Sequence, residues 1–405
     1  MIMSKKFDFK ITKKVKGTLA RAGIISTPHG DIQTPAFIAV GTKATVKALT
    51  PEHIAGFGAQ AVLANAYHLY LQPSPEIIDQ AGGVGAFMNW RAPTFTDSGG
   101  FQVLSLGVGF KKVINMNADA NEQMATVRKG ERLAHVDDDG VSFKSHIDGS
   151  LHRFTPESSI AIQHQLGADI MFAFDECTSI AQPYSYQKMS LKRTHAWAER
   201  CIIEHQKQTK QRKDKPYQAL FGVIQGANYQ DLRQEAAKFM GDLPFDGYGI
   251  GGALEKEKLG AIVKWVNDIL PENKPRHLLG LSEPDDIFIG IENGADTFDC
   301  VSPARIGRNG SIYTLDGRFT IKKSIYRADF SPLVEECGCY TCTNFTKAYI
   351  NHLFRAGERL AATLATIHNE YFIVQLVNDI RLSIINDTFQ EHKAKWLSRY
   401  YGKQS

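Results

Sequence analysis

The sequence ADIMFAFD at residues 168–175 is one of eight short β-prone runs that together decide the fold. The others are PAFIAV (35–40), AVLAN (61–65), PTFTD (93–97), ALFGVIQG (219–226), GYGIGG (247–252), HLLGL (277–281) and DTFDC (296–300). Segments with helical periodicity separate most of these runs, for example 158–166, 186–205, 229–240, 255–269 and 285–293. Alternating strands and helices predict a parallel sheet, and eight strands in this length of chain favour a (β/α)8 barrel over an open doubly wound sheet.

The bulk composition is that of an ordinary globular protein. The chain has 405 residues, of which 43% are hydrophobic, and a net charge of +4, which permits a nucleic-acid partner without requiring one. No apolar run is long enough to cross a bilayer, and the basic N-terminus lacks the apolar core of a secretory signal. These features predict a cytoplasmic protein with no membrane partner. Six cysteines without an export signal argue against a disulfide framework.

Polar residues stand where several of the apolar runs end. Asn65, Asp97, Asp175, Gln225 and Asp299 all follow or close such runs. Taken alone, Asp97 in TFTDSGGFQ (94–102) is more simply the first residue of a turn. In a barrel, however, the carboxyl ends of all strands converge on the face where active sites are built. The grouping therefore makes the aspartates and Gln225 candidates for catalysis.

The motifs for other chemistries are weak or missing. The sequence has no HExxH motif and no GxxxxGK[ST] phosphate loop. GYGIGG does spell GxGxxG, but Glu272, about twenty positions later, falls in a proline-flanked turn, so a dinucleotide site is not expected. Carboxylates without a catalytic metal suit covalent or acid–base substitution at an anomeric carbon.

The same strand ends offer a slot for a flat ligand. Gly-Gly turns at 99–100 and 251–252 let the backbone approach a ligand closely. Phe101 and Leu279 could sandwich that ligand, while an Asp and a Gln beside the slot could recognise its polar edge, as in purine pockets.

Two regions interrupt the strand–helix pattern. Residues 107–138 are polar and irregular, and VSFKSH and SLHRF then alternate around an Asp148-Gly149 turn, which predicts a β-hairpin. We therefore expect a catalytic barrel over residues 1–330 that carries an antiparallel insertion at 107–154. Residues 331–405 are expected to form a helical, zinc-binding subdomain packed on the barrel, with helices at 348–357 and 367–386.

A cysteine cluster predicts the zinc site. Cys337, Cys339 and Cys342 form a CxCxxC motif, and three thiolates leave a tetrahedral Zn²⁺ one ligand short. His368, at the start of an amphipathic helix, is the favoured fourth ligand, and His352 is the alternative. Such a closed site with one Zn²⁺ is structural, whereas free or redox-active cysteines are the competing interpretation.

With these residues assembled, the chain resembles the tRNA-guanine transglycosylases of bacterial type over nearly its whole length. The matching motifs are AYHL (66–69), TDSGGFQ (96–102), FDEC (174–177), GVIQG (222–226), GYGIGG (247–252), FDCVSPAR followed by RNG (298–310), the CxCxxC cluster and TIHN (366–369). The resemblance implies His368 as the fourth zinc ligand, tRNA with a GUN anticodon and a 7-deazaguanine base as partners, and a homodimer.

The resemblance also implies a role for each site residue. Asp299 would be the nucleophile that displaces guanine from the wobble nucleotide, and Asp97 the general acid and base. The base pocket would consist of Asp175 and Gln225 on the base edge, helped by Ser98 and the backbone of Gly252, with Phe101 and Leu279 stacked on the two base faces. Arg305 and Arg308 would hold neighbouring nucleotides of the anticodon loop.

The sequence departs from the usual pattern at GGALEKE (251–257), where Ala253 and Glu255 alter the pocket wall. The resemblance implies prequeuosine-1 base as the incoming base. Because the pocket wall is altered, queuine is the alternative. A retaining glycoside hydrolase would also use two carboxylates on a barrel, but none of the four tryptophans lies in a strand-end motif. A non-catalytic tRNA-binding subunit would lack Asp97 and Asp299. An archaeosine-type enzyme is not favoured, because no RNA-binding domain follows the C-terminal helices.

Overall fold

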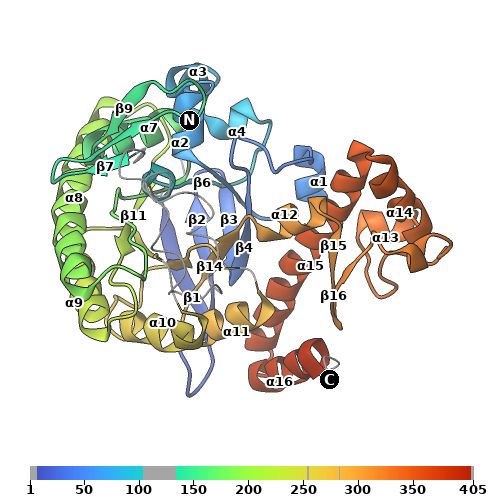
Figure 1. Ribbon diagram of the computed structural model, residues 1–405. Helices are drawn as coiled ribbons and strands as arrows, with labels where there is room; N and C mark the ends of the chain where they lie inside the picture. Colours follow the sequence, from blue (N-terminus) through green and yellow to red (C-terminus); the bar gives the residue numbers. More distant parts are fainter. Residues whose placement is uncertain (1–6, 104–133, 253–254, 282, 403–405) are drawn as a thin grey trace.

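Eight parallel strands form a closed barrel with helices around it, as the computed structural model in Figure 1 shows. The structure describes residues 7–103, 134–252, 255–281 and 283–402. The barrel strands are β4 (Ala36–Val40), β5 (Val62–Ala64), β6 (Thr94–Thr96), β10 (Ile170–Phe172), β11 (Ala219–Ile224), β12 (Gly247–Ile250), β13 (Arg276–Leu278) and β14 (Thr297–Cys300). Each of the eight predicted runs contributes one of these strands, and β14 closes the barrel by pairing with β4. The predicted (β/α)8 barrel is confirmed.

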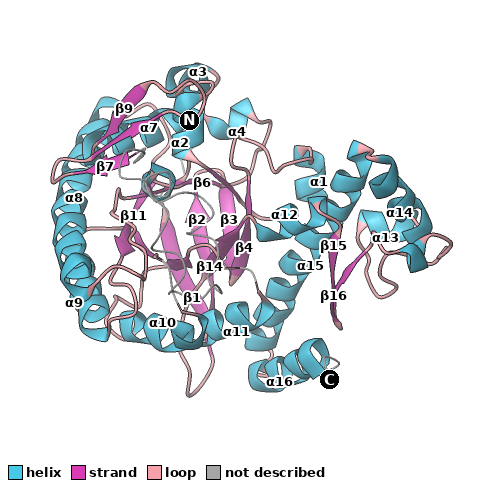
Figure 2. Ribbon diagram, viewed as in Figure 1, coloured by secondary structure: helices cyan, strands magenta, loops and turns pink. Residues whose placement is uncertain are grey.

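The helices between the barrel strands form the outer layer, coloured cyan in Figure 2. They are α1 (Pro51–Gly56), α2 (Ala66–Leu71), α3 (Pro75–Gln80), α4 (Val84–Phe87), α7 (Pro156–Leu166), α8 (Tyr184–Gln211), α9 (Gln230–Asp242), the short 3-10 helix η1 (Lys256–Lys258), α10 (Leu259–Asn267) and α11 (Pro284–Glu292). Local signals set their ends. The Thr155 hydroxyl caps α7 by accepting a hydrogen bond from the Ser158 N–H, and Gly167 ends that helix with a φ of 69°.

An N-terminal antiparallel sheet, which we did not predict, covers the amino-terminal end of the barrel. Its strands are β1 (Asp8–Lys14), β2 (Arg21–Thr27) and β3 (Gly30–Thr34). Ile25 and Ile32 join the apolar cluster that fills the barrel interior. Arg21 is buried and pairs with Asp296, just before β14, at 2.6 Å. Because this sheet covers one end, the opposite end of the barrel is the one available for a site.

The antiparallel insertion before the fourth barrel strand is confirmed. It contains β7 (Ala134–Val136), β8 (Val141–Lys144) and β9 (Leu151–Phe154), so the predicted hairpin has one additional strand. At the predicted turn Gly149 has a φ of 76°, and Asp148 accepts a hydrogen bond from the Ser150 N–H. Residues 107–133 of the predicted insertion lie outside the described residues.

After β14 the chain forms α12 (Ser302–Arg308), the hairpin β15 (Ser311–Thr314) and β16 (Gly317–Thr320), and the 3-10 helix η2 (Ser324–Tyr326). Four more helices follow: α13 (Tyr340–Asn344), α14 (Lys347–Ala356), α15 (Arg359–Ile385) and α16 (Phe389–Gly402). Helix α15 begins earlier than predicted and runs from the lobe at the right of Figure 1 to the barrel. Its residues Ile373 and Val377 are buried in the main apolar cluster of the barrel. Ile312 and Ile321 share a second cluster with the cysteine segment, and the division at residue 330 stays a prediction.

No helix in the described part of the chain combines the length and the apolar character that crossing a membrane requires.

Candidate active site and metal centre

The barrel brings the predicted polar residues to one end. Asp97 directly follows β6, Asp175 lies three residues beyond β10, and Gln225 directly follows β11. Asp299 lies within β14, one residue before its end. Since all eight strands are parallel, these positions belong to the carboxyl end of the barrel, opposite the N-terminal sheet.

Asp97 is half-buried, and donors from neighbouring elements hold both of its carboxylate oxygens. Its Oδ1 accepts hydrogen bonds from the backbone N–H groups of Ala66 at 2.9 Å and Gly99 at 3.2 Å, and its Oδ2 accepts one from the Asn65 side-chain amide. The pKa of Asp97 is raised to about 7, mainly by burial and in part by the negative charge of Asp299, and the backbone donors lower it only partly. A carboxyl group with a pKa near neutrality is suited to both donating and accepting a proton.

Among the described residues, the partners of Asp299 contact one of its two carboxylate oxygens. Its Oδ1 lies 3.0 Å from Nε2 of His277 and 3.2 Å from the backbone N of Gly280. The side chain is 13% exposed, whereas His277 is fully buried. Asp299 is therefore reachable from the barrel opening while it remains firmly oriented.

Three residues of the predicted base pocket, Ser98, Asp175 and Gln225, form a compact polar cluster. Gln225 donates from Nε2 to Oδ2 of Asp175 at 2.7 Å, and the Ser98 hydroxyl donates to Oδ1 of Asp175 at 3.3 Å. Burial raises the pKa of Asp175 to about 6. Oε1 of Gln225 is buried and makes no hydrogen bond within the described part of the chain. The cluster thus presents an acceptor oxygen and a carboxyl group to a ligand edge.

Gly252 lies against this cluster with a φ of +95°, and a Cβ atom added there would stand 2.7 Å from Oε1 of Gln225. Leu279 lies nearby, because its Cδ1 is within 3.3 Å of a Cβ placed on Gly251. Phe101 is 40% exposed. No contact joins Phe101 to Leu279 among the contacts of the described residues, so stacking of both on a base stays a prediction.

Arg305 and Arg308 lie on α12, which begins three residues after Asp299. Both are half-buried, and Arg305 donates to the Ser302 hydroxyl at 3.1 Å. Burial and the positive charge of Arg305 lower the pKa of Arg308. Both arginines thus lie on the element that follows Asp299 along the chain.

The pocket wall that departs from the usual pattern is described only in part. The backbone N of Glu255 donates to the Asn228 side chain at 3.3 Å, and its carboxylate pairs with Lys258 at 2.8 Å. Ala253 lies outside the described residues.

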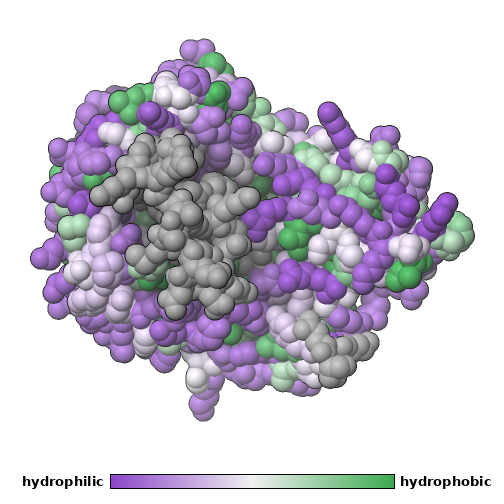
Figure 3. All heavy atoms as spheres, viewed as in Figure 1, coloured by the Kyte–Doolittle hydropathy of each residue, from purple (hydrophilic) through white to green (hydrophobic). Residues whose placement is uncertain are grey.

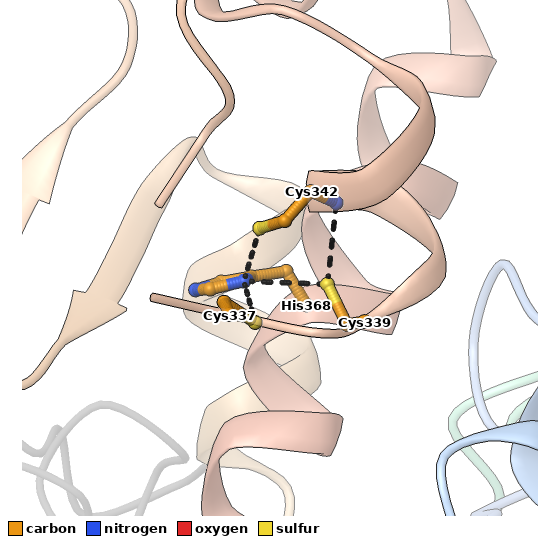
Figure 4. Close-up of side chains that lie close together, drawn as sticks. All are labelled: Cys337, Cys339, Cys342 and His368. Atoms are coloured by element: carbon orange, nitrogen blue, oxygen red, sulfur yellow. Dashed lines mark hydrogen bonds between the residues drawn. The ribbon is translucent and has the colours of Figure 1, made fainter. Parts of the chain in front are cut away.

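The four predicted metal ligands come together in the C-terminal lobe (Figure 4). Nδ1 of His368 lies 3.5, 3.6 and 3.3 Å from the sulfur atoms of Cys337, Cys339 and Cys342. A tetrahedral Zn²⁺ with Zn–S of about 2.3 Å and Zn–N of about 2.0 Å spaces such atoms roughly 3.5 Å apart. Nε2 of His368 is 2.8 Å from the carbonyl oxygen of Tyr313, to which it donates, so Nδ1 is left unprotonated for a metal. The residues fit a structural zinc ion.

The alternative ligand, His352, is exposed on α14 and does not belong to the metal-binding group. The geometry therefore favours His368 over His352 as the fourth ligand.

Two further residues of the site, His277 and Arg233, were missed by the sequence analysis. His277 opens the predicted run HLLGL and contacts Asp299, whereas Asn65, which was expected at a strand end without a role, contacts Asp97. Arg233 on α9 is fully buried and donates to the carbonyl oxygens of Ile224 at 2.8 Å and Gly251 at 2.9 Å, joining the ends of β11 and β12. For His277, the sequence signal was a histidine at the start of an apolar strand. No signal in the sequence indicated that Arg233 belongs to the site.

Known proteins match the chain over almost its whole length. The family model described as queuine tRNA-ribosyltransferase matches residues 16–402. The chain is 46% identical over 399 residues to the queuine tRNA-ribosyltransferase of Thermoanaerobacter pseudethanolicus, covering 98% of both proteins. It is 44% identical over 401 residues to that of Halothermothrix orenii, covering 98% of this chain and 99% of the relative. It is also 42% identical over 403 residues to that of Streptococcus sanguinis, covering 98% of both. The chain therefore belongs to the queuine tRNA-ribosyltransferase family, the tRNA-guanine transglycosylase enzymes that its motifs resemble.

Proposed function

We propose that this enzyme exchanges guanine at the wobble position of tRNAs with a GUN anticodon for prequeuosine-1 base, 7-aminomethyl-7-deazaguanine, in queuosine biosynthesis. The observation that carries the proposal is a pair of carboxylates, Asp97 and Asp299, at one end of the barrel and close enough that the charge of Asp299 contributes to the raised pKa of Asp97. Beside them lies a pocket whose polar groups suit the edge of a purine-like base.

The reaction we propose is a double displacement. An Asp299 carboxylate oxygen forms a bond to C1′ of the ribose as the bond from C1′ to N9 of guanine breaks, and the electron pair of that bond leaves with the base. Asp97 in its protonated form supplies the proton that the departing base takes up. The ionised Asp97 then takes a proton from the incoming base, whose nitrogen attacks C1′ and releases Asp299. Because its pKa is about 7, Asp97 can serve in both directions near neutral pH.

We propose that Asp175 and Gln225 select the base by its edge. The free Oε1 of Gln225 accepts from an N–H of the base, with Ser98 and the backbone of Gly252 alongside. The target nucleotide must leave the anticodon stack to reach this pocket. Phe101 and Leu279 would then cover the two faces of the base.

The choice of incoming base is the finest part of the proposal. Of the two altered residues of the pocket wall, Glu255 is the one that the structure describes. If its carboxylate turns away from Lys258, it can attract the positively charged aminomethyl group of prequeuosine-1 base. Queuine, with a larger substituent, is the alternative. Measuring kcat/KM for both bases with one tRNA preparation decides between them, and a preference for queuine would contradict our choice.

The partners we propose are tRNA and a second copy of the chain. Arg305 and Arg308 are placed to bind phosphates next to the target nucleotide. In the C-terminal lobe, Tyr340, Phe345 and Tyr349 form an aromatic cluster with ring centroids 5.8 and 5.6 Å apart. Tyr340 is 53% exposed and Tyr349 is 40% exposed, and apolar surface is visible on this lobe in Figure 3. Exposed aromatic clusters are typical of interfaces, which supports a homodimer.

We further propose that the cysteine cluster holds one Zn²⁺, which ties α13 to α15 and takes no part in the chemistry. Since the proposed substrate is tRNA, we place the enzyme in the cytoplasm. A non-catalytic subunit or a glycoside hydrolase is disfavoured, because both carboxylates are present and the relatives are ribosyltransferases.

The central test is incorporation of radiolabelled guanine into tRNA with a GUN anticodon. Wild-type enzyme should catalyse the exchange and form a covalent RNA adduct that survives denaturing gel electrophoresis. Asp299→Ala should abolish both. Normal exchange by Asp299→Ala would refute the assignment of the nucleophile, and no exchange by the wild type would refute the reaction.

A further inference from the structure

We propose that His277 is a positioning residue that, together with Thr297, selects which carboxylate oxygen of Asp299 attacks the ribose. This inference rests on the proposed function, because it assigns a role around its nucleophile. It arises from a chain of hydrogen bonds that runs from Thr297 through the imidazole of His277 to Asp299.

The two oxygens of Asp299 have different surroundings. Oδ1 faces Nε2 of His277 and the backbone N–H of Gly280, at 3.0 and 3.2 Å. Oδ2 has no hydrogen-bond partner within the described part of the chain. A carboxylate oxygen that accepts two hydrogen bonds is a weaker nucleophile than its free neighbour, because the donors stabilise its negative charge. The geometry therefore reserves Oδ2 for the bond to C1′.

The carboxylate of Asp299 sets the tautomer of His277, and the Thr297 hydroxyl complements it. An ionised carboxylate only accepts hydrogen bonds, so the proton of the neutral ring must sit on Nε2. Nδ1 then carries a lone pair, and the Thr297 hydroxyl, 2.8 Å away, donates to it. If the proton moved to Nδ1, the lone pair on Nε2 would face the Asp299 carboxylate, and the orienting hydrogen bond would be lost.

Packing prevents the imidazole from turning away. His277 is fully buried, with its ring centroid 5.6 Å from that of Phe95 and 5.2 Å from that of Phe172. These phenylalanines belong to the apolar filling of the barrel interior. A group held this firmly can fix the carboxylate orientation before substrate arrives, and a misplacement of about 1 Å at a reacting atom can cost 10²-fold in rate.

The experiment measures the first-order rate constant of covalent adduct formation with saturating tRNA in a single turnover. His277→Phe keeps a planar ring but removes the donor, and we expect its rate constant to fall about 100-fold at unchanged KM for tRNA. His277→Gln can donate from a similar position and should recover much of the rate. Thr297→Val, which keeps the shape but removes the hydroxyl, should lose about tenfold, whereas Thr297→Ser should retain the wild-type rate.

A matched control separates positioning from general core damage. His195 is another buried histidine, stacked on Phe239 in the outer layer of the barrel at a centroid distance of 4.1 Å. His195→Phe should leave the rate constant of adduct formation at its wild-type value. Melting temperature and metal content report whether each variant folds.

A wild-type rate for folded His277→Phe, a defect confined to KM, or no recovery with His277→Gln would each overturn the inference. Asp299→Ala distinguishes this failure from failure of the proposed function. If Asp299→Ala forms no adduct while His277→Phe forms it normally, only the role of His277 is wrong. If Asp299→Ala still forms the adduct, the proposed nucleophile itself is wrong.

Discussion

The raised pKa of Asp97 makes the stability of this protein depend on pH in a direction that can be calculated. In the unfolded chain an aspartate ionises with a pKa of about 3.9. In the folded protein burial raises that pKa to about 7. Between these values the folded state holds a proton that the unfolded state has released. The stability from this group is complete below pH 4 and is lost as the pH rises to 7. Integrated from pH 5 to pH 8, the loss in the free energy of unfolding is roughly 2.5 kcal/mol.

Asp97→Asn removes this contribution because an amide does not titrate. The variant also loses a hydrogen bond, since its own amide group would face the donor of Asn65. That cost is the same at pH 5 and at pH 8. It therefore cancels when the free energy of unfolding at one pH is subtracted from that at the other. Between pH 5 and pH 8 the free energy of unfolding should therefore decrease less for Asp97→Asn than for the wild type. The difference between the two decreases should be roughly 2.5 kcal/mol. Guanine exchange should be lost at every pH.

The assay is urea-induced unfolding followed by tryptophan fluorescence at pH 5 and pH 8 in the same buffer. Asp268→Asn is the control, because Asp268 lies at the surface and pairs with Lys264, one helical turn away. It should show the pH dependence of the wild type. If Asp97→Asn loses as much stability as the wild type between the two pH values, Asp97 does not titrate near neutrality, and its assignment as the general acid and base fails with it.

Three further perturbations test the pocket, the metal centre and the RNA-binding helix. Gly252→Ala places a Cβ atom 2.7 Å from Oε1 of Gln225 and should raise the KM for the incoming base. Gly17→Ala is the control and should leave KM unchanged, because Gly17 has a similar positive φ but open space around it. Cys339→Ser should release the zinc, which is measured as metal per chain. It should also lower the melting temperature, because a structural Zn²⁺ contributes directly to folding. An unchanged metal content would contradict the site. Arg305→Ala should weaken tRNA binding and reduce the slope of log K against log salt by about 1, and an unchanged slope would show that Arg305 contacts no phosphate.

Much of this architecture was predictable because its signals are local. The eight apolar runs that became the barrel strands are short and contain β-prone residues, and each formed the expected strand. The N-terminal sheet was missed because the sequence of β1, DFKITKK, alternates lysines with apolar residues and suggests a solvated, basic terminus. Only its packing against the barrel interior shows why Ile25 and Ile32 are apolar.

The sequence by itself determined the family, the barrel, the strand-end carboxylates and the cysteine motif, because these depend on residue type and on spacing along the chain. Tertiary structure alone decided which groups face one another. It brought His368 to three sulfur atoms, placed Asn65 on Asp97, and aligned Thr297 and His277 with one oxygen of Asp299. Neighbouring barrel strands are close in space but distant in sequence, so the hydrogen bonds between their ends follow from the barrel closing and from no local pattern.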